Sequence, residues 1–91
     1  MLETFDDINF QTEVLQSTIP VTVDFGAVWC GPCRSMLPVI SKISETSTLY
    51  KIGKLDIDDN QTTAAAFNIS SIPTFIFFKD GKELHRLTGL S

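Results

Sequence analysis

The segment TFIFF at residues 74–78 is apolar at consecutive positions rather than at alternate ones. In an extended strand, Phe75 and Phe77 lie on one face, and Ile76 and Phe78 lie on the other. A strand with this pattern is buried on both faces, as in sheets that have helices packed on two sides. The segment therefore restricts the chain to folds in which a sheet lies between layers of helices.

Strand and helix signals alternate along the rest of the chain. Strand composition occurs at residues 2–5, 21–25 and 50–58. The Asp-Gly pair in KDGK, residues 79–82, favours a tight hairpin turn, so residues 83–87 should return as an antiparallel edge strand. The order βαβαβαββ predicts an α/β fold. Its mixed sheet has central parallel strands and an antiparallel hairpin at one edge, with helices on both faces.

Three helices are expected between these strands. The first lies near residues 8–17, begins at a cap of Asp6 or Asp7, and has an apolar face of Ile8, Phe10, Val14 and Leu15. The second follows Cys30, with a kink at Pro38 and an apolar face of Met36, Leu37, Ile40 and Ile43. The third lies near residues 60–67 and begins at a cap of Asp58 or Asp59.

Length and charge exclude several classes of protein. A chain of 91 residues with 43% hydrophobic content suits one domain over residues 1–91. Its 7 basic and 11 acidic residues form no basic stripe of the kind that nucleic acid requires. The first residues, MLETFDDINF, carry acids where a signal peptide is basic, and no segment approaches the roughly 18 apolar residues of a membrane span. We therefore expect a cytoplasmic protein that binds neither nucleic acid nor membrane.

Both cysteines of the chain lie in the pentapeptide WCGPC, at positions 30 and 33. A structural disulfide is a poor explanation, because such bonds are rare in reducing cytoplasm and a loop this small restricts the unfolded chain little. A metal site is a second alternative, but beyond the two cysteines only His85 and carboxylates remain as ligands, so no metal is expected. Redox chemistry is the third reading.

The position of Cys30, between a strand and a helix, favours this redox reading. Unpaired N–H groups and the positive end of the helix dipole stabilise a thiolate at the start of a helix. We therefore expect Cys30 to be the exposed nucleophile. Cys33, one helical turn further on, is then the shielded resolving thiol, which attacks a mixed disulfide formed at Cys30. Gly31 and Pro32 stiffen the turn between the two sulfur atoms.

The chain resembles the thioredoxin family over almost its whole length. The similar segments are VDFGAVWCGPC, KLDID, SIPTFIFF and KDGK, and WCGPC is the most specific of them. The resemblance implies a protein-disulfide reductase with no bound cofactor, which receives electrons from a flavin-containing thioredoxin reductase. A thioredoxin-like binding or structural module, which uses the same groove for contact alone, is the alternative.

The resemblance also implies roles for residues outside the cysteine pair. Asp24 matches a buried acid that takes the proton of Cys33, and on its strand it should share a face with Thr22 and Gly26. Lys54 matches a lysine close to this acid, and Pro73 matches a cis-proline that faces the cysteines. The apolar substrate groove corresponds to Trp29, Gly31, Pro32, Ile72, Pro73 and Gly89, and an extended substrate would pair with the backbone at Ile72.

The sequence departs from the family pattern in two places. Gly26 stands where many members have a bulky aromatic residue. The chain also stops at TGLS, so we expect it to lack the carboxy-terminal helix that covers one sheet face in the family. The helix after Cys33 would then be alone on its side of the sheet, and we expect self-association through the uncovered part of that face.

Overall fold

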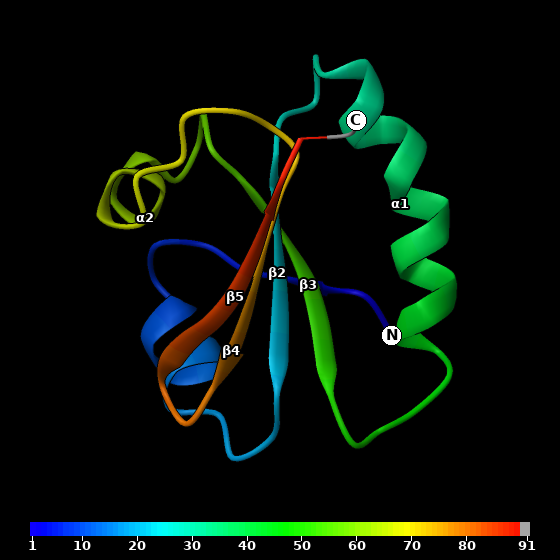
Figure 1. The fold of residues 1–91 in the computed structure, drawn as a ribbon, viewed down its shortest axis with the longest axis vertical. Helices are drawn as coiled ribbons and strands as arrows, with labels where there is room; N and C mark the ends of the chain where they lie inside the picture. The colour runs from blue at the N-terminus through cyan, green and yellow to red at the C-terminus, as the bar shows by residue number, and fades with distance from the viewer. Residues whose placement is uncertain (90–91) are drawn as a thin grey trace.

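The computed structural model describes residues 1–89, which form a five-stranded sheet with helices on both faces (Figure 1). The strands lie in the order β1-β3-β2-β4-β5. Their bounds are β1 Glu3–Thr4, β2 Val21–Gly26, β3 Lys51–Asp56, β4 Thr74–Lys79 and β5 Lys82–Thr88. β1, β3 and β2 run parallel, whereas β4 and β5 are antiparallel to their neighbours. The predicted mixed α/β sheet is confirmed.

The two sheet faces carry different numbers of helical segments. A π-helical turn, η1 (Gln11–Leu15), and α2 (Gln61–Ala66) lie on one side, while α1 (Gly31–Ser44) lies on the other (Figure 1). The larger hydrophobic core lies on the side of η1 and α2 and includes Val23, Phe25 and Ile76. On the α1 side, a smaller cluster joins Ile40, Ile52 and Phe75. The chain thus places most of its packed apolar side chains on one face.

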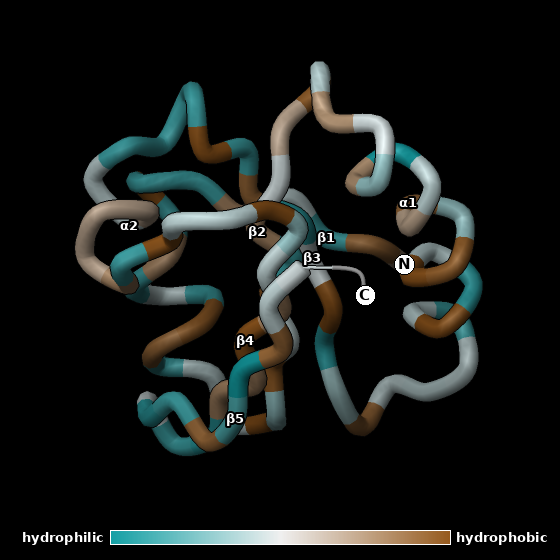
Figure 2. The backbone as a smooth tube through the Cα atoms, turned by 45° about the horizontal axis from the view of Figure 1, so that its top comes forward, coloured by the Kyte–Doolittle hydropathy of each residue, from teal (hydrophilic) through white to brown (hydrophobic). Residues whose placement is uncertain are grey.

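β4 is buried from both sides, as its consecutive apolar residues predicted. Phe75 is 8% exposed on the α1 side, and Ile76 is fully buried on the other. Figure 2 shows hydrophobic stretches on β4 beside hydrophilic stretches on the edge strand β5. The turn between the two strands has positive φ at both Asp80 and Gly81, which is the conformation that an Asp-Gly hairpin favours. The predicted hairpin is confirmed.

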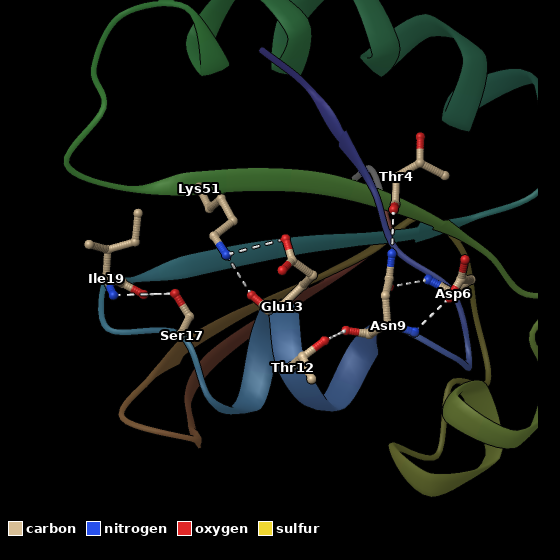
Figure 3. Close-up of polar contacts among 8 residues, drawn as sticks. All are labelled: Thr4, Asp6, Asn9, Thr12, Glu13, Ser17, Ile19 and Lys51. Carbon is tan, nitrogen blue, oxygen red and sulfur yellow. Dashed lines mark hydrogen bonds and ion pairs between the residues drawn. The ribbon is translucent and has the colours of Figure 1, made fainter.

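The first helical segment differs from the prediction at its start. Ile8 is 92% exposed and belongs to no apolar face, and regular helical structure begins only at Phe10. Asp6 instead caps the turn before the helix, because its carboxylate accepts hydrogen bonds from the backbone N–H groups of Ile8 and Asn9, whereas Phe10 precedes η1 without a side-chain cap. The Asn9 side chain in turn accepts from the Asp6 N–H, so the two residues cap each other reciprocally (Figure 3). This reciprocal turn leaves the Ile8 side chain outside the core.

A lysine on β3 ties η1 to the sheet. Lys51 donates a hydrogen bond of 2.8 Å to the Glu13 carbonyl, and its ammonium lies 3.7 Å from the Glu13 carboxylate (Figure 3). After η1, the Ser17 hydroxyl donates to the Ile19 carbonyl and closes the turn that leads into β2. These contacts hold η1 against the strands that it covers.

The predicted cap of α2 at Asp58 or Asp59 is wrong. Asn60 precedes the helix, and its side chain makes no capping hydrogen bond. Instead Asp7, far away in the sequence, accepts hydrogen bonds from the backbone N–H and the hydroxyl of Thr63. These bonds hold the pKa of Asp7 below its usual value. The helix start is therefore stabilised by a tertiary contact, which leaves Asp58 available for another partner.

The helix expected to be missing after β5 concerns residues beyond Gly89, which lie outside the described residues. The structure does describe the face that this expectation concerns. On that face α1 packs through Met36, Leu37 and Ile40, whereas Ile43 is 43% exposed. The predicted apolar face of α1 is thus only partly covered.

Packing between Phe5 and Gly53 gives a test of how β1 joins the sheet. A Cβ atom at Gly53 would lie 2.3 Å from the ring of Phe5, which is 1% exposed and has no room to move. We expect Gly53→Ala to lower the free energy of unfolding by about 1 to 3 kcal/mol, because it overpacks a full core. In a Phe5→Leu background the same change should cost less. Denaturant unfolding of the four variants measures this coupling, and an additive result would contradict the assigned contact.

Candidate active site

Cys30 and Cys33 lie where β2 leads into α1, and they form a disulfide with Cα atoms 5.2 Å apart. Cys30 is the N-cap of α1, and its sulfur accepts a hydrogen bond of 3.2 Å from the backbone N–H of Cys33. A helix start also presents the positive end of the backbone dipole to this sulfur. The predicted position of Cys30 between strand and helix is confirmed, and its environment stabilises negative charge on sulfur.

Exposure does not separate the two cysteines, contrary to expectation. Cys30 was predicted to be exposed, yet it is 6% exposed in the disulfide form, against 5% for Cys33. Both pack with Ala27 against the half-buried side chains of Ile57 and Ile72. What distinguishes the sulfurs is their location, because Cys30 caps the helix while Cys33 lies inside its first turn.

Two side chains hold the loop in front of Cys30. The indole N–H of Trp29 donates a hydrogen bond of 2.8 Å to the carboxylate of Asp58. Arg34, which follows Cys33 in α1, donates from its guanidinium to the carbonyl of Val28 at 2.8 Å. The sequence reasoning missed both functions, since it assigned Asp58 to a helix cap and gave Arg34 no role. No local pattern marks either pair, although Arg34 directly follows the cysteine motif.

Asp24 lies on β2 with its side chain buried on the α1 side of the sheet. It is 3% exposed, and its Oδ1 atom has no hydrogen-bond partner. Burial raises the pKa of Asp24 to about 6, and the positive charge of Lys54 opposes this rise. Lys54 is exposed and lies directly across from Asp24 in the β2–β3 pairing. The expected buried acid and its neighbouring lysine are thus side by side in the structure.

Gly26 lies between the buried acid Asp24 and Cys33. A Cβ atom placed on Gly26 would lie 3.2 Å from the Cys33 sulfur and 3.8 Å from Asp24 Oδ1. Both atoms are therefore within 4 Å of a single point beside Gly26. The sequence predicted that this glycine shares a face of its strand with Asp24 and marked it as a departure from the family pattern. In the structure the Asp24 carboxyl group and the Cys33 sulfur border the same space beside this glycine.

The proline loop lies against the cysteines. The Ile72–Pro73 peptide bond is cis, as expected, and Pro73 is fully buried. Ile72 packs against the cluster that contains both cysteines. The backbone N–H of Gly89 donates to the Pro73 carbonyl at 2.7 Å and thereby brings the end of β5 to this loop.

The remaining predicted groove residues differ in exposure. Trp29 is 65% exposed and Pro32 is also exposed, so both reach solvent close to the disulfide. Gly31 is half-buried at the first position of α1. Within residues 1–89, no cluster of three or more His, Cys, Asp or Glu side chains could hold a metal ion. His85 lies on β5, where it stacks on Phe77.

A cysteine pair at a helix start, with a buried acid beneath it and a cis-proline loop beside it, defines a thiol–disulfide oxidoreductase. The thioredoxin family model matches residues 1–91. A thioredoxin of Mycobacterium tuberculosis (strain ATCC 25618 / H37Rv) is 49% identical over 84 residues, which cover 91% of this chain and 72% of the relative. A thioredoxin of Rickettsia typhi is 43% identical, covering 99% of this chain and 87% of the relative. The chain belongs to the thioredoxin family and is a protein-disulfide oxidoreductase.

The raised pKa of Asp24 predicts how stability depends on pH. Because the folded chain holds this proton more tightly than the unfolded chain, the free energy of unfolding falls as the pH rises from 3.8 to about 6. Above that range the buried carboxylate costs on the order of 3 kcal/mol. We expect Asp24→Asn to stabilise the oxidised chain by about 2 to 3 kcal/mol near pH 8 and by little near pH 4.

Guanidinium unfolding at both pH values measures this difference. Asp80→Asn is the matched control, because Asp80 is exposed in the β4–β5 turn and its positive φ suits Asn equally. The control should leave the pH dependence of the parent chain unchanged. A gain in stability from Asp24→Asn that is the same at both pH values would contradict the buried ionised carboxylate.

Proposed function

We propose that this chain reduces disulfide bonds of other proteins through Cys30 and Cys33. The Cys30 thiolate attacks one sulfur of the substrate, forms a mixed disulfide and releases the other substrate sulfur as a thiolate. The Cys33 thiolate then attacks the Cys30 sulfur, which releases the second substrate thiolate and leaves the Cys30–Cys33 disulfide. The observation that carries this proposal is the hydrogen bond from the Cys33 N–H to the Cys30 sulfur at the start of α1.

Asp24 is the proposed acceptor of the Cys33 proton. Its raised pKa of about 6 brings it close to neutral pH, where a general base is effective. Its Oδ1 has no hydrogen-bond partner, and both this oxygen and the Cys33 sulfur lie within 4 Å of the same point beside Gly26. Lys54 supports this role, since its charge favours the ionised carboxylate that accepts the proton.

The substrate is proposed to bind where the proline loop meets the cysteines. An extended segment would pair with the backbone at Ile72 and lie against Pro73, while the exposed Trp29 covers its other side. Gly31, Pro32 and Gly89 complete the surface around the sulfurs. We assign no cofactor to this chain, because the dithiol itself carries the two electrons.

The electron source and the cellular setting are also proposals. Two relatives named thioredoxin share 49% and 43% of aligned residues with this chain, which supports a flavin-containing thioredoxin reductase as the donor. Within residues 1–89, no helix is long and apolar enough to cross a membrane. We propose that residues 1–91 act in the cytoplasm as a single domain in electron transport and redox homeostasis.

Reduction of insulin disulfides tests the activity directly. With a thioredoxin reductase and NADPH, the chain should precipitate insulin chains at a rate that depends on its own concentration. Cys30→Ser should abolish turnover, whereas Asp80→Asn should leave the rate unchanged. An inactive parent chain that still binds disulfide-containing peptides would favour the alternative of a binding module.

The proposed roles of the two thiols can be separated by trapping. Cys33→Ser should accumulate a mixed disulfide at Cys30, because no thiol remains to resolve it. Cys30→Ser should trap at least about tenfold less substrate, because Cys33 lies inside the helix turn and lacks the capping position. Non-reducing electrophoresis and mass spectrometry quantify the adducts. Equal trapping by both variants would contradict the assignment of Cys30 as the nucleophile and Cys33 as the resolving thiol.

We also propose self-association through the incompletely covered face beside α1. A groove of about 560 Å³ runs between α1 and strands β4 and β5, and Ile43, Phe77 and Leu87 line it. Among the described residues, none that lines it is charged, so two copies of a chain with net charge −4 repel each other least at this face. A ridge one helical turn long lies beside the groove and consists of Val39, which is 47% exposed, and Ile43. A second copy could insert its ridge into the groove and receive the first ridge in return.

Leu87 and Leu84 provide a matched pair for testing this interface. Leu87 lines the groove and is 49% exposed, whereas Leu84 lies outside it and is 65% exposed, so both tolerate a polar side chain. We expect Leu87→Gln to weaken dimer formation at least about tenfold and Leu84→Gln to have little effect. Sedimentation across a concentration series measures this. A parent chain that stays monomeric throughout, or equal effects of both variants, would refute the proposal.

A further inference from the structure

A second cavity lies at the end of β2 and β3 that faces the disulfide. Its volume is about 370 Å³, which is within the roughly 300 to 1,000 Å³ of small-molecule sites. The Gly26 backbone forms part of its wall, and both Asp24 and Cys33 line it. A side chain at Gly26 would project toward the Cys33 sulfur and Asp24 Oδ1, so its absence leaves this space open. Neither the proline loop nor the Trp29 side chain contributes to the cavity.

Most of the cavity wall is apolar. Leu37 from α1 lines it together with Ala27 and Val28, which follow β2, and these aliphatic side chains can pack against one aromatic ring. Phe5 and Leu55 also line it, but each is 1% exposed and belongs to the large core on the other face of the sheet. Asp24 is a polar group within this wall. It is 97% buried, its Oδ1 has no hydrogen-bond donor, and a buried carboxylate oxygen without a donor is costly. The cavity therefore presents a ring-sized apolar space with one unsatisfied acceptor.

The charges around the cavity favour a cation. Four acidic residues line it, Asp6, Asp24, Asp56 and Asp59, against the two basic residues Arg34 and Lys54. Within residues 1–89 the only ion pairs join Lys51 to Glu13 and Arg86 to Glu83, so none of these four acids forms a salt bridge, and Lys54 acts on Asp24 only through the longer-range effect of its charge. The Arg34 guanidinium is engaged with the Val28 carbonyl. The net field of the lining is negative and attracts a positively charged donor.

We propose that this cavity is a binding site for a small aromatic cation of the amidine or amine type. The ring packs against Leu37, Ala27 and Val28, and the charged N–H groups donate to Asp24 Oδ1. A charge-assisted hydrogen bond of this kind is stronger than a neutral one, so the carboxylate distinguishes the cation from neutral molecules of the same shape. The ligand occupies the space next to Cys33 and leaves the substrate groove at Ile72 and Trp29 free.

Occupancy of this site has a consequence for turnover. A cation bound to Asp24 holds the carboxylate ionised and occupies the oxygen that would take the Cys33 proton. Resolution of the mixed disulfide is then slowed while substrate binding is not. This consequence rests on the proposed role of Asp24 in catalysis, whereas binding itself does not.

Binding is tested on the oxidised chain, without turnover. Benzamidine, its neutral isostere benzamide and the anion benzoate are titrated into isotopically labelled protein, and amide chemical shifts are followed by NMR. Benzamidine should shift the amides of Asp24, Gly26 and Leu55, and it should bind at least about tenfold more tightly than benzamide. Benzoate should not bind. Similar affinities for all three probes, or shifts confined to other parts of the chain, would overturn the proposal.

Variants locate the site and separate its charges. Asp24→Asn should weaken the binding of benzamidine at least about tenfold. Asp80→Asn, in the β4–β5 turn at the opposite end of the sheet, should leave the binding unchanged (Figure 1). Between about pH 7.5 and pH 5, affinity of the parent should fall about tenfold as Asp24 takes up its proton. The charged residues that line the cavity beside Asp24 are Lys54, Arg34, Asp6, Asp56 and Asp59. If the affinity for benzamidine still depends on pH in Asp24→Asn, the dependence comes from these groups and the site as proposed is refuted.

Discussion

The position of β2 between β3 and β4 is the constraint on which the rest of the structure depends. Because β2 is paired on both edges, its side chains alternate strictly between two covered faces. Val21, Val23 and Phe25 enter the large core, while Asp24 and Gly26 are forced toward α1 and the disulfide. The carboxyl group is buried by this alternation, and its raised pKa follows from the burial. One strand thus provides both part of the large core and the buried acid beneath the cysteines.

Long-range hydrogen bonds hold the segments at that end of the sheet. Asp7 binds the start of α2, Asp58 binds Trp29, and Arg34 binds the loop that Trp29 occupies. Each contact joins a charged side chain to an N–H group or a carbonyl that has no partner within its own helix or loop. Together they fix the loop before Cys30 from two sides. Cys30 therefore follows a loop that is held by Asp58, from a segment distant in sequence, and by the nearby Arg34 of α1.

The two cavities described above have different chemistry because they lie at different places beside α1. The larger groove lies along β4 and β5, where the described lining is uncharged and open to another apolar surface. The smaller one lies at the carboxyl ends of β2 and β3, where loop acids gather around Asp24. An apolar surface favours a protein partner, whereas an apolar space with one buried carboxylate favours a small cation. The thioredoxin fold of this chain thus offers two surfaces apart from the substrate groove.

Local signals in the sequence were sufficient for the strands, the Asp80–Gly81 hairpin and the start of α1 at Cys30. Each of these depends on residues within a few positions of one another, so periodicity and turn chemistry predict them. The predicted burial of Asp24 followed from the same alternation together with the family resemblance. The exposed Ile8, the cap of α2 by Asp7 and the bond from Trp29 to Asp58 were decided by the tertiary structure alone. Those outcomes depend on which segments the sheet order brings together, and a carboxylate pairs with the nearest unsatisfied donor in space rather than in sequence.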